Sequence, residues 1–146
     1  MRYRTRKLVK PGDLNPEDTL FGGRLLEWLD EECAIYAVCQ LGTSNLRTKI
    51  IGEIDFKSPA RQGDIIEIGV DVVAFGKTSV TLKAEVRNKN TKQTILTIDK
   101  FVMVSVDGFG KPTPHGKTCV RLDDDEPQEG VTRADPPVCS PSDYFG

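Results

Sequence analysis

Apolar and polar positions first separate along residues 22 to about 40, where the spacing is that of an α-helix. One stripe is apolar and consists of Leu26, Leu29, Cys33 and Ala37. The opposite side is charged and carries Arg24, Glu27 and Glu31. A stripe of apolar side chains three to four residues apart is typical of a helix that covers a core. The pattern therefore predicts one long amphipathic helix.

The remaining apolar segments are rich in β-branched residues and are short enough to be strands. We expect five strands, at residues 4–9, 46–56, 64–75, 79–88 and 94–106. The connections between the last four are only a few residues long, whereas parallel neighbours need crossovers of a dozen residues or more. The sheet is therefore predicted to be antiparallel.

An antiparallel sheet must bury one face, and the predicted helix is the element that can cover it. The fold class expected from the pattern is α+β, with one long helix packed across a five-stranded antiparallel sheet. Pairing of two such sheets would bury further surface and protect an exposed edge strand. Dimerisation is thus physically reasonable.

Composition agrees with a single domain of 146 residues, of which 38% are apolar and 29% charged. No apolar run reaches the length of a membrane span, and the basic N-terminus is not followed by the apolar stretch of a signal peptide. The basic residues are scattered and form no nucleic-acid motif. We therefore expect a cytoplasmic protein that binds neither membranes nor nucleic acids.

Charge divides the chain near residue 121. Residues 122–146 hold seven acidic side chains against Arg133 alone, a net charge of −6, so the rest of the chain carries +4. This segment is also rich in proline and poor in large apolar residues, a composition typical of disorder. We expect a folded domain over residues 1–121 and a disordered tail over 122–146. The basic body suits a polyanionic ligand, although ordinary surface lysines explain it equally well.

The four cysteines, Cys33, Cys39, Cys119 and Cys139, have spacings that fit neither a metal site nor a dense disulfide scaffold. We expect free thiols and no bound metal. His115 is the sole histidine, and it lies in a loop flanked by proline and glycine. This position argues against a hydrolase that depends on a catalytic histidine.

The start of the predicted helix combines two features of acyl-transfer chemistry. Gly22 and Gly23 allow a ligand to approach the backbone closely, and the first helical turn leaves its N–H groups unpaired and partly positive. Asp30 follows seven residues after Gly23, at the border of the apolar stripe. A carboxylate that activates water, together with amide donors for an oxyanion, is a minimal site for ester or thioester hydrolysis.

The segment from Asn15 to Asp30, NPEDTLFGGRLLEWLD, resembles a motif of the hotdog-fold acyl-CoA thioesterases. The branch is that of the small bacterial acyl-CoA hydrolases and the animal brain-type enzyme. The resemblance continues through Thr48 and residues 54–59, 63–64, 76–79, 101–106 and 110–114, so that it covers about residues 5 to 118. The chain departs from the motif at Asp18, where the family often has glycine, and at Thr19.

The resemblance implies roles for individual residues. Asp30 would be the catalytic base or nucleophile, and the amide near Gly23 in the facing subunit would polarise the thioester carbonyl. Thr48 would lie near the catalytic carboxylate, or it is simply a strand threonine. Asn15 would hold the loop or a water molecule, or it forms an Asx turn before Pro16.

A further segment of the resemblance lines the path of pantetheine and nucleotide in the family. It consists of Gly76, Lys77, Thr78 and Ser79. The alternative for these four residues is a plain hairpin turn. Lys111 and Lys117 flank a later loop and are further candidates for phosphate contacts, although a solvated role suits them better.

The function that follows is hydrolysis of acyl-CoA to a carboxylic acid and free CoA, without cofactor or metal, by a dimer or a dimer-based tetramer or hexamer. A non-catalytic acyl-CoA-binding regulatory module is the alternative from another class. Hydrolysis of acyl-carrier-protein or aryl thioesters would differ in substrate alone.

Overall fold

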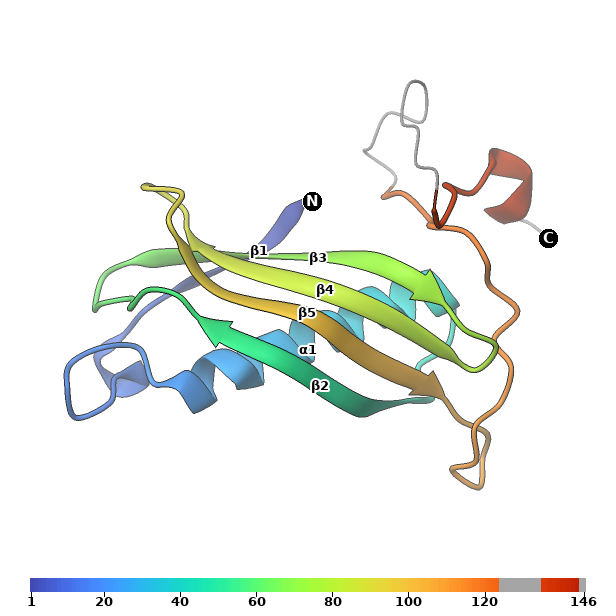
Figure 1. Ribbon diagram of the computed structural model, residues 1–146, viewed down its shortest axis with the longest axis horizontal. Helices are drawn as coiled ribbons and strands as arrows, with labels where there is room; N and C mark the ends of the chain where they lie inside the picture. The colour runs from blue at the N-terminus through green and yellow to red at the C-terminus, as the bar shows by residue number, and fades with distance from the viewer. Residues whose placement is uncertain (124–134, 145–146) are drawn as a thin grey trace.

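The computed structural model describes residues 1–123 and 135–144, and within them it contains one long helix and one sheet (Figure 1). The helix α1 spans Gly22–Leu41. The strands are β1 (Tyr3–Leu8), β2 (Leu46–Phe56), β3 (Ile65–Phe75), β4 (Ser79–Asn88) and β5 (Thr94–Ser105). Two short 3-10 helices occupy Pro11–Asp13 and Pro141–Tyr144. The predicted helix and all five predicted strands are confirmed.

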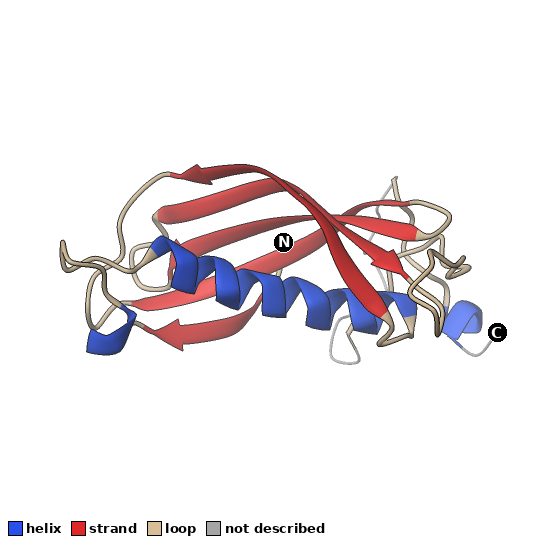
Figure 2. Cartoon of the chain, turned by 90° about the horizontal axis from the view of Figure 1, so that it is seen from below, coloured by secondary structure: helices blue, strands red, loops and turns tan. Residues whose placement is uncertain are grey.

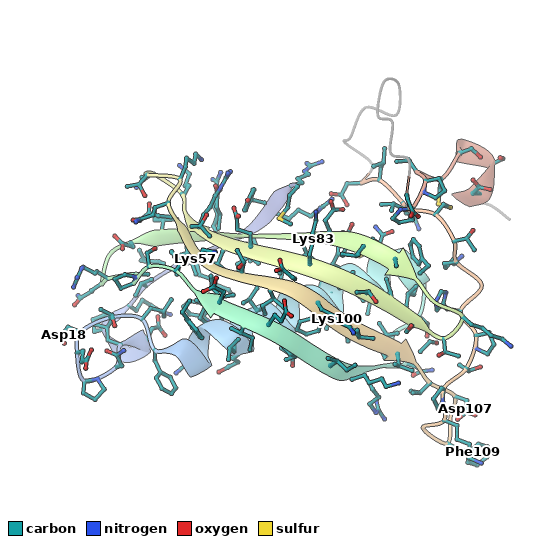
Figure 3. The ribbon with its side chains drawn as sticks, viewed as in Figure 1. Asp18, Lys57, Lys83, Lys100, Asp107 and Phe109 are labelled. Carbon is teal, nitrogen blue, oxygen red and sulfur yellow. A yellow bond between two sulfur atoms is a disulfide. The ribbon has the colours of Figure 1, made fainter. Side chains whose placement is uncertain are left out.

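The strands pair in the order β1-β3-β4-β5-β2, and every pair is antiparallel, as predicted. The helix α1 runs across one face of this sheet (Figure 2). Lys83 and Lys100 project from the opposite face (Figure 3). The strand order itself was not predicted, because β1 and β2 reach the two edges through pairings between segments far apart in the chain.

The core lies between α1 and the sheet. Its fully buried side chains include Leu25 and Leu29 from α1 and Leu82 and Phe101 from the sheet. The predicted helical stripe is correct for Leu29, Cys33 and Ala37 but wrong at its start, where Leu25 is buried and Leu26 only partly so. The buried face of α1 also includes Glu32 and Gln40, which the apolar pattern does not mark.

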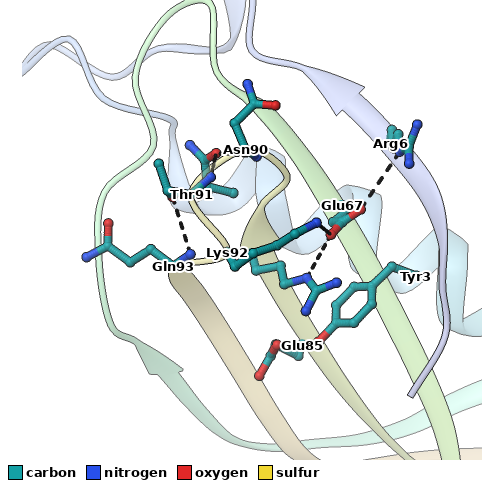
Figure 4. A network of polar contacts seen from close by, with 10 residues as sticks. Tyr3, Arg6, Glu67, Glu85, Asn90, Thr91, Lys92 and Gln93 are labelled. Atoms are coloured by element: carbon teal, nitrogen blue, oxygen red, sulfur yellow. Dashed lines mark hydrogen bonds and ion pairs between the residues drawn. The ribbon is translucent and has the colours of Figure 1, made fainter.

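A charged network joins β1 to β3 and β4 (Figure 4). Glu67 on β3 is buried, and its carboxylate accepts a hydrogen bond from Arg87 Nε at 2.7 Å and one from Lys92 Nζ at 3.3 Å. Arg6 Nε lies 3.8 Å from the same carboxylate. Burial alone would raise the pKa of Glu67, but the bonds and positive charges of Arg87 and Lys92 outweigh burial and lower it.

The structure of the C-terminal residues contradicts one prediction about the cysteines. Cys119 and Cys139 form a disulfide, so the expectation of free thiols is wrong for this pair and correct for Cys33 and Cys39. Spacing could not reveal the pairing, because it depends on how residues 135–144 return to the domain. A parallel bridge between Val120 and Val138 lies beside the disulfide.

The segment predicted to be a disordered tail lies partly outside the described residues, at 124–134 and 145–146. The domain boundary at residue 121 therefore stays a prediction. Within the described ranges, no helix is both long and apolar enough to cross a lipid bilayer.

Candidate active site

The helix α1 and the edge strand β2 bring together Asp30 and Thr48, which are 18 residues apart in the sequence. The Thr48 hydroxyl donates a hydrogen bond to Oδ1 of Asp30 across 2.8 Å. Both residues are exposed in the single chain. The bond fixes one carboxylate oxygen and leaves Oδ2 with no bond to another described residue. A carboxylate held in this way has a fixed orientation and keeps one oxygen available for a ligand or a water molecule.

An irregularity in the pairing of β2 with β5 lies next to this contact. Thr48 is opposite Met103, and the register shifts between Thr48 and Ile50. A bulge of this kind bends a strand and changes the direction in which a side chain points. The irregularity thus places the hydroxyl in a locally distorted part of the sheet edge, over the helix.

The start of α1 leaves donors available. Phe21 is the N-cap residue, with an extended backbone at ψ 126°, and its side chain makes no capping bond. Leu25 N–H donates to Phe21 C=O at 3.1 Å, so the free amides of the first turn are those before Leu25. Within the described part of the chain, the amides of Gly22 and Gly23 have no recorded acceptor. They suit an oxyanion.

The two glycines lie close to aromatic rings. A Cβ at Gly23 would lie 2.6 Å from Phe21 Cε1, and a Cβ at Gly22 would lie 3.2 Å from the Phe56 ring. Side chains at these positions would therefore displace the rings and cover the amides. Phe21 and Phe56 are each 55% exposed, so both rings border the surface beside the helix start.

Asn15 organises the loop before α1. Its Oδ1 accepts hydrogen bonds from the amides of Glu17 at 3.0 Å and Thr19 at 3.1 Å, and its Nδ2 donates to Thr19 Oγ1 at 2.9 Å. This is the Asx turn that the sequence left as an alternative. The side chain holds the loop.

Asp18 explains one departure from the family motif. Its φ is +59°, in the left-handed region where glycine is unstrained and aspartate is tolerated better than most residues. A glycine, which the resemblance leads one to expect at this position, would adopt the same backbone conformation without strain.

The loop and the helix start line one cleft of about 360 Å³, which is bordered by Asn15, Gly22 and Phe56. Asp30 is not part of this cleft. Eight residues separate Gly22 from Asp30, a rise of about 12 Å along a helix. A single chain thus separates the predicted donors from the predicted carboxylate.

The four residues of the predicted pantetheine path form the hairpin between β3 and β4. Gly76 N–H donates to Ser79 C=O at 2.8 Å, and a Cβ at Gly76 would lie 2.4 Å from Ser79 Oγ. Thr78 C=O accepts from the amide of Ser105 at 2.7 Å, while Lys77 is exposed. The hairpin alternative describes this local structure correctly, and an exposed cation stands at its tip.

His115 binds the same hairpin from the loop after β5. Its Nε2 lies 2.8 Å from Ser79 C=O, and its Nδ1 accepts a hydrogen bond from the amide of Lys117 at 3.0 Å. Both ring nitrogens are thus occupied by the backbone. This agrees with the expectation that His115 is not a catalytic base.

Two buried polar residues of α1 escaped the sequence analysis. Glu32 accepts a 2.6 Å hydrogen bond from Thr5 Oγ1 on β1, and Gln40 exchanges two hydrogen bonds with the backbone of Arg121. Their partners are distant in the sequence, so no local pattern could reveal them.

Burial, with the negative charges of Asp30 and Glu32 as smaller causes, raises the pKa of the Cys33 thiol, so Cys33 is an inert core residue.

The residues with metal-binding groups converge, in the described ranges, at Cys119, Cys139 and Asp143. The disulfide uses both sulfurs. Asp143 accepts hydrogen bonds from the amide and hydroxyl of Ser140.

Comparison with known proteins identifies the family of the chain. The sequence profile of the thioesterase superfamily matches residues 17–95. The acyl-CoA thioester hydrolase YciA of Salmonella typhimurium is 30% identical over 115 residues, which cover 75% of this chain and 86% of that protein.

Solved structures of acyl-CoA thioesterases are also similar to this chain. The structure described as an apo-hexameric acyl-CoA thioesterase is 36% identical, with a TM-score of 0.67 over 75% of this chain and 72% of that one. An acyl-CoA hydrolase from Staphylococcus aureus, solved with butyryl coenzyme A and coenzyme A, is 28% identical, with a TM-score of 0.69 over 75% of this chain and 66% of that one.

The chain belongs to the thioesterase superfamily, and its fold is the hotdog fold. It is a thioester hydrolase, because the names of these relatives and the sequence motif both indicate this activity.

Proposed function

We propose that the protein hydrolyses acyl-CoA, with Asp30 as the catalytic carboxylate and the amides of Gly22 and Gly23 as the oxyanion donors. The observation that carries this proposal is the hydrogen bond between Thr48 and Asp30, which orients one carboxylate oxygen and leaves the other available. The named relatives support acyl-CoA as the substrate.

The chemistry follows from this arrangement. Acting as a general base, Asp30 takes a proton from water while the water oxygen bonds to the thioester carbonyl carbon. The carbonyl oxygen becomes an oxyanion, which accepts hydrogen bonds from the helix-start amides. When the intermediate collapses, the carbon–sulfur bond breaks, and the leaving CoA sulfur receives the proton. Acting as a nucleophile instead, Asp30 would bond to the thioester carbonyl carbon and form an anhydride as the carbon–sulfur bond breaks and CoA leaves as a thiolate. Water then hydrolyses the anhydride to the carboxylic acid and the free Asp30 carboxylate, and the thiolate takes the proton released. Thr48 orients the carboxylate in both routes.

Gly22 and Asp30 are separated by about 12 Å along α1. One thioester carbonyl group therefore cannot contact both residues of the same chain. A site that uses both therefore draws the carboxylate from one subunit and the amides from its partner. Asn15, which holds the loop before the helix start, would preserve the position of those amides.

The edge strand β2 is the surface best suited to such a partner. It pairs on one side with β5, and its other edge has no strand beside it among the described residues. Ile50, Ile51 and Ile54 on this strand are each more than a third exposed, and Phe56 at its end is 55% exposed. An edge strand of eleven residues that exposes these four apolar side chains invites pairing with another strand. Since Thr48 also lies on β2, a dimer formed there would cover the candidate site.

We propose a dimer as the smallest active unit, with assembly into a larger oligomer built from dimers. The related acyl-CoA thioesterase of known structure is hexameric, which supports the larger assembly.

The hairpin formed by Gly76, Lys77, Thr78 and Ser79 is the proposed contact for the CoA moiety. Lys77 is an exposed cation at its tip, and the backbone amides of a tight turn suit phosphate oxygens.

The cytoplasmic location expected from the sequence stays a proposal. The Cys119–Cys139 disulfide argues against this location, because disulfides are rare in reducing compartments such as the cytoplasm.

The experiment that tests the function is release of free thiol from short, medium, long and aromatic acyl-CoAs, with the carboxylic acid product quantified in parallel. We expect one thiol and one acid per substrate consumed. Binding of acyl-CoA without thiol release across the whole series would instead identify the non-catalytic binding module.

A further inference from the structure

Three of the four cysteines gather at the end of α1, away from the candidate active site. Cys39 is an exposed free thiol on the last turns of the helix. The Cys119–Cys139 disulfide lines the same cavity of about 290 Å³ as Cys39. A free thiol that lines the same cavity as a disulfide is a candidate for thiol–disulfide exchange.

The chain around Cys119 is anchored to the helical turn that carries Cys39. Gln40, the residue after Cys39, donates to Arg121 C=O through Nε2 at 2.7 Å and accepts from Arg121 N–H through Oε1 at 2.9 Å. Gln40 is buried, so this pair of bonds is protected from water. Since Arg121 lies two residues after Cys119, the bonds hold Cys119 close to the end of α1.

Cys139 is held to the domain through Val120. Its amide donates to Val120 C=O at 2.8 Å, and the amide of Val120 donates to Pro137 C=O at 2.7 Å. These two bonds and the Val120–Val138 bridge all end at one residue of the domain. Of the two half-cystines, Cys119 is the one whose chain is bonded directly to the turn of α1 that carries Cys39.

We propose that Cys39 is an exchange site, whose thiolate attacks Sγ of Cys119 and releases Cys139. The Cys39–Cys119 bond forms as the Cys119–Cys139 bond breaks, and the sulfur of Cys139 leaves as a thiolate that takes the proton lost by Cys39. One disulfide and one thiol exist before and after the step, so no oxidant or reductant is consumed. The exchange removes the disulfide cross-link between residues 135–144 and the domain and places a free thiol on the C-terminal segment.

Cys33 is excluded from this chemistry. It is fully buried in the core, and burial raises its pKa, which keeps it protonated. Replacing Cys33 with alanine therefore removes a sulfur without touching the exchange site, and it simplifies the measurement.

The test is disulfide mapping of the full chain carrying Cys33→Ala. The protein is incubated without oxidant at pH 6 and at pH 9, free thiols are blocked with N-ethylmaleimide, and tryptic peptides are identified by mass spectrometry. Trypsin separates the three cysteines into peptides 25–47, 118–121 and 134–146. At pH 9 we expect at least roughly one tenth of the chains to join 25–47 to 118–121, because the exchange is redox-neutral and depends on thiolate.

A matched variant, Cys33→Ala with Cys39→Ser, should keep the Cys119–Cys139 linkage alone at both pH values. Circular dichroism of both variants establishes that they are folded. Detection of Cys119–Cys139 alone in the Cys33→Ala protein at pH 9, or of Cys39 joined to Cys139, would overturn the proposal. The outcome is independent of thioesterase activity.

Discussion

Thr48 on the edge strand donates a 2.8 Å hydrogen bond to the Asp30 carboxylate on the helix, and this bond joins two residues that are 18 positions apart in the sequence. Because β2 is an edge strand with exposed isoleucines, the pair also marks a surface that a second subunit would cover. In the proposed dimer, the candidate catalytic carboxylate therefore lies at the interface.

The first prediction concerns the Thr48 hydroxyl. Replacing Thr48 with valine keeps the branched shape but removes the donor, so Asp30 loses its orientation. We expect kcat to fall roughly 10-fold to 100-fold, the scale of a misplaced catalytic group. Thr48→Ser keeps a hydroxyl and should retain most of the activity. Equal activity of the valine and serine variants would show that the bond has no catalytic role. Steady-state thiol release measures both.

The second prediction concerns the helix start. A Gly23→Val side chain would displace the Phe21 ring, which a Cβ would approach to 2.6 Å, and would crowd the amides. Because Phe21 is exposed, its ring has room to move and the protein should fold while thiol release falls. Gly12→Ala is the matched control, since a Cβ at Gly12 meets nothing within 4 Å. Loss of activity in both variants would point to a general disturbance of the loop.

The third prediction tests the shared site by complementation. Asp30→Ala and Gly23→Val chains are each inactivated in a different half of the site. If they are mixed under conditions that exchange subunits, half of the dimers are heterodimers, and each contains one intact site. We expect about a quarter of wild-type activity to return. No recovery, despite heterodimers detected by native mass spectrometry, would mean that carboxylate and amides come from the same chain.

The fourth prediction is a dependence of stability on pH. The pKa of Glu67 is lowered in the folded protein by Arg87 and Lys92, so its ionised form stabilises the fold above the ordinary glutamate pKa of about 4.3. This contribution is lost as the pH falls from about 4.3 through the lowered value. The free energy of unfolding should therefore decrease over this range more steeply in the wild type than in Glu67→Gln, as urea titrations would measure.

A matched variant, Glu17→Gln, replaces an exposed carboxylate that has no ion pair among the described residues. It should follow the wild-type curve. Parallel curves for wild type and Glu67→Gln would show that the Glu67 network does not stabilise the fold.

Local patterns in the sequence were sufficient for the helix, the strands and their antiparallel pairing. Each of these depends on side chains within a few residues of one another. The strand order, the buried Glu32 and the disulfide of Cys119 with Cys139 depend on contacts between distant segments, and hydrophobic periodicity carries no information about such contacts.

The candidate site shows the same division. The resemblance placed Thr48 near the carboxylate, and the structure shows the hydrogen bond between them. The sequence left two roles open for Asn15, and they coincide in the structure, because the Asx turn is what holds the loop. Asp30 was expected at the border of the buried stripe and is exposed in the single chain, because the surface that would cover it belongs to a second subunit in the proposed dimer.

The most direct test of the central claim compares thiol release from acyl-CoA by the wild-type protein and by Asp30→Asn at saturating substrate. Asparagine keeps the size of the side chain and an acceptor for Thr48 but cannot act as a base or form the acyl anhydride. The account predicts a folded protein whose turnover is lower by roughly 100-fold to 10,000-fold, the range for loss of a positioned acid or base. A folded Asp30→Asn protein with turnover close to that of the wild type would contradict it.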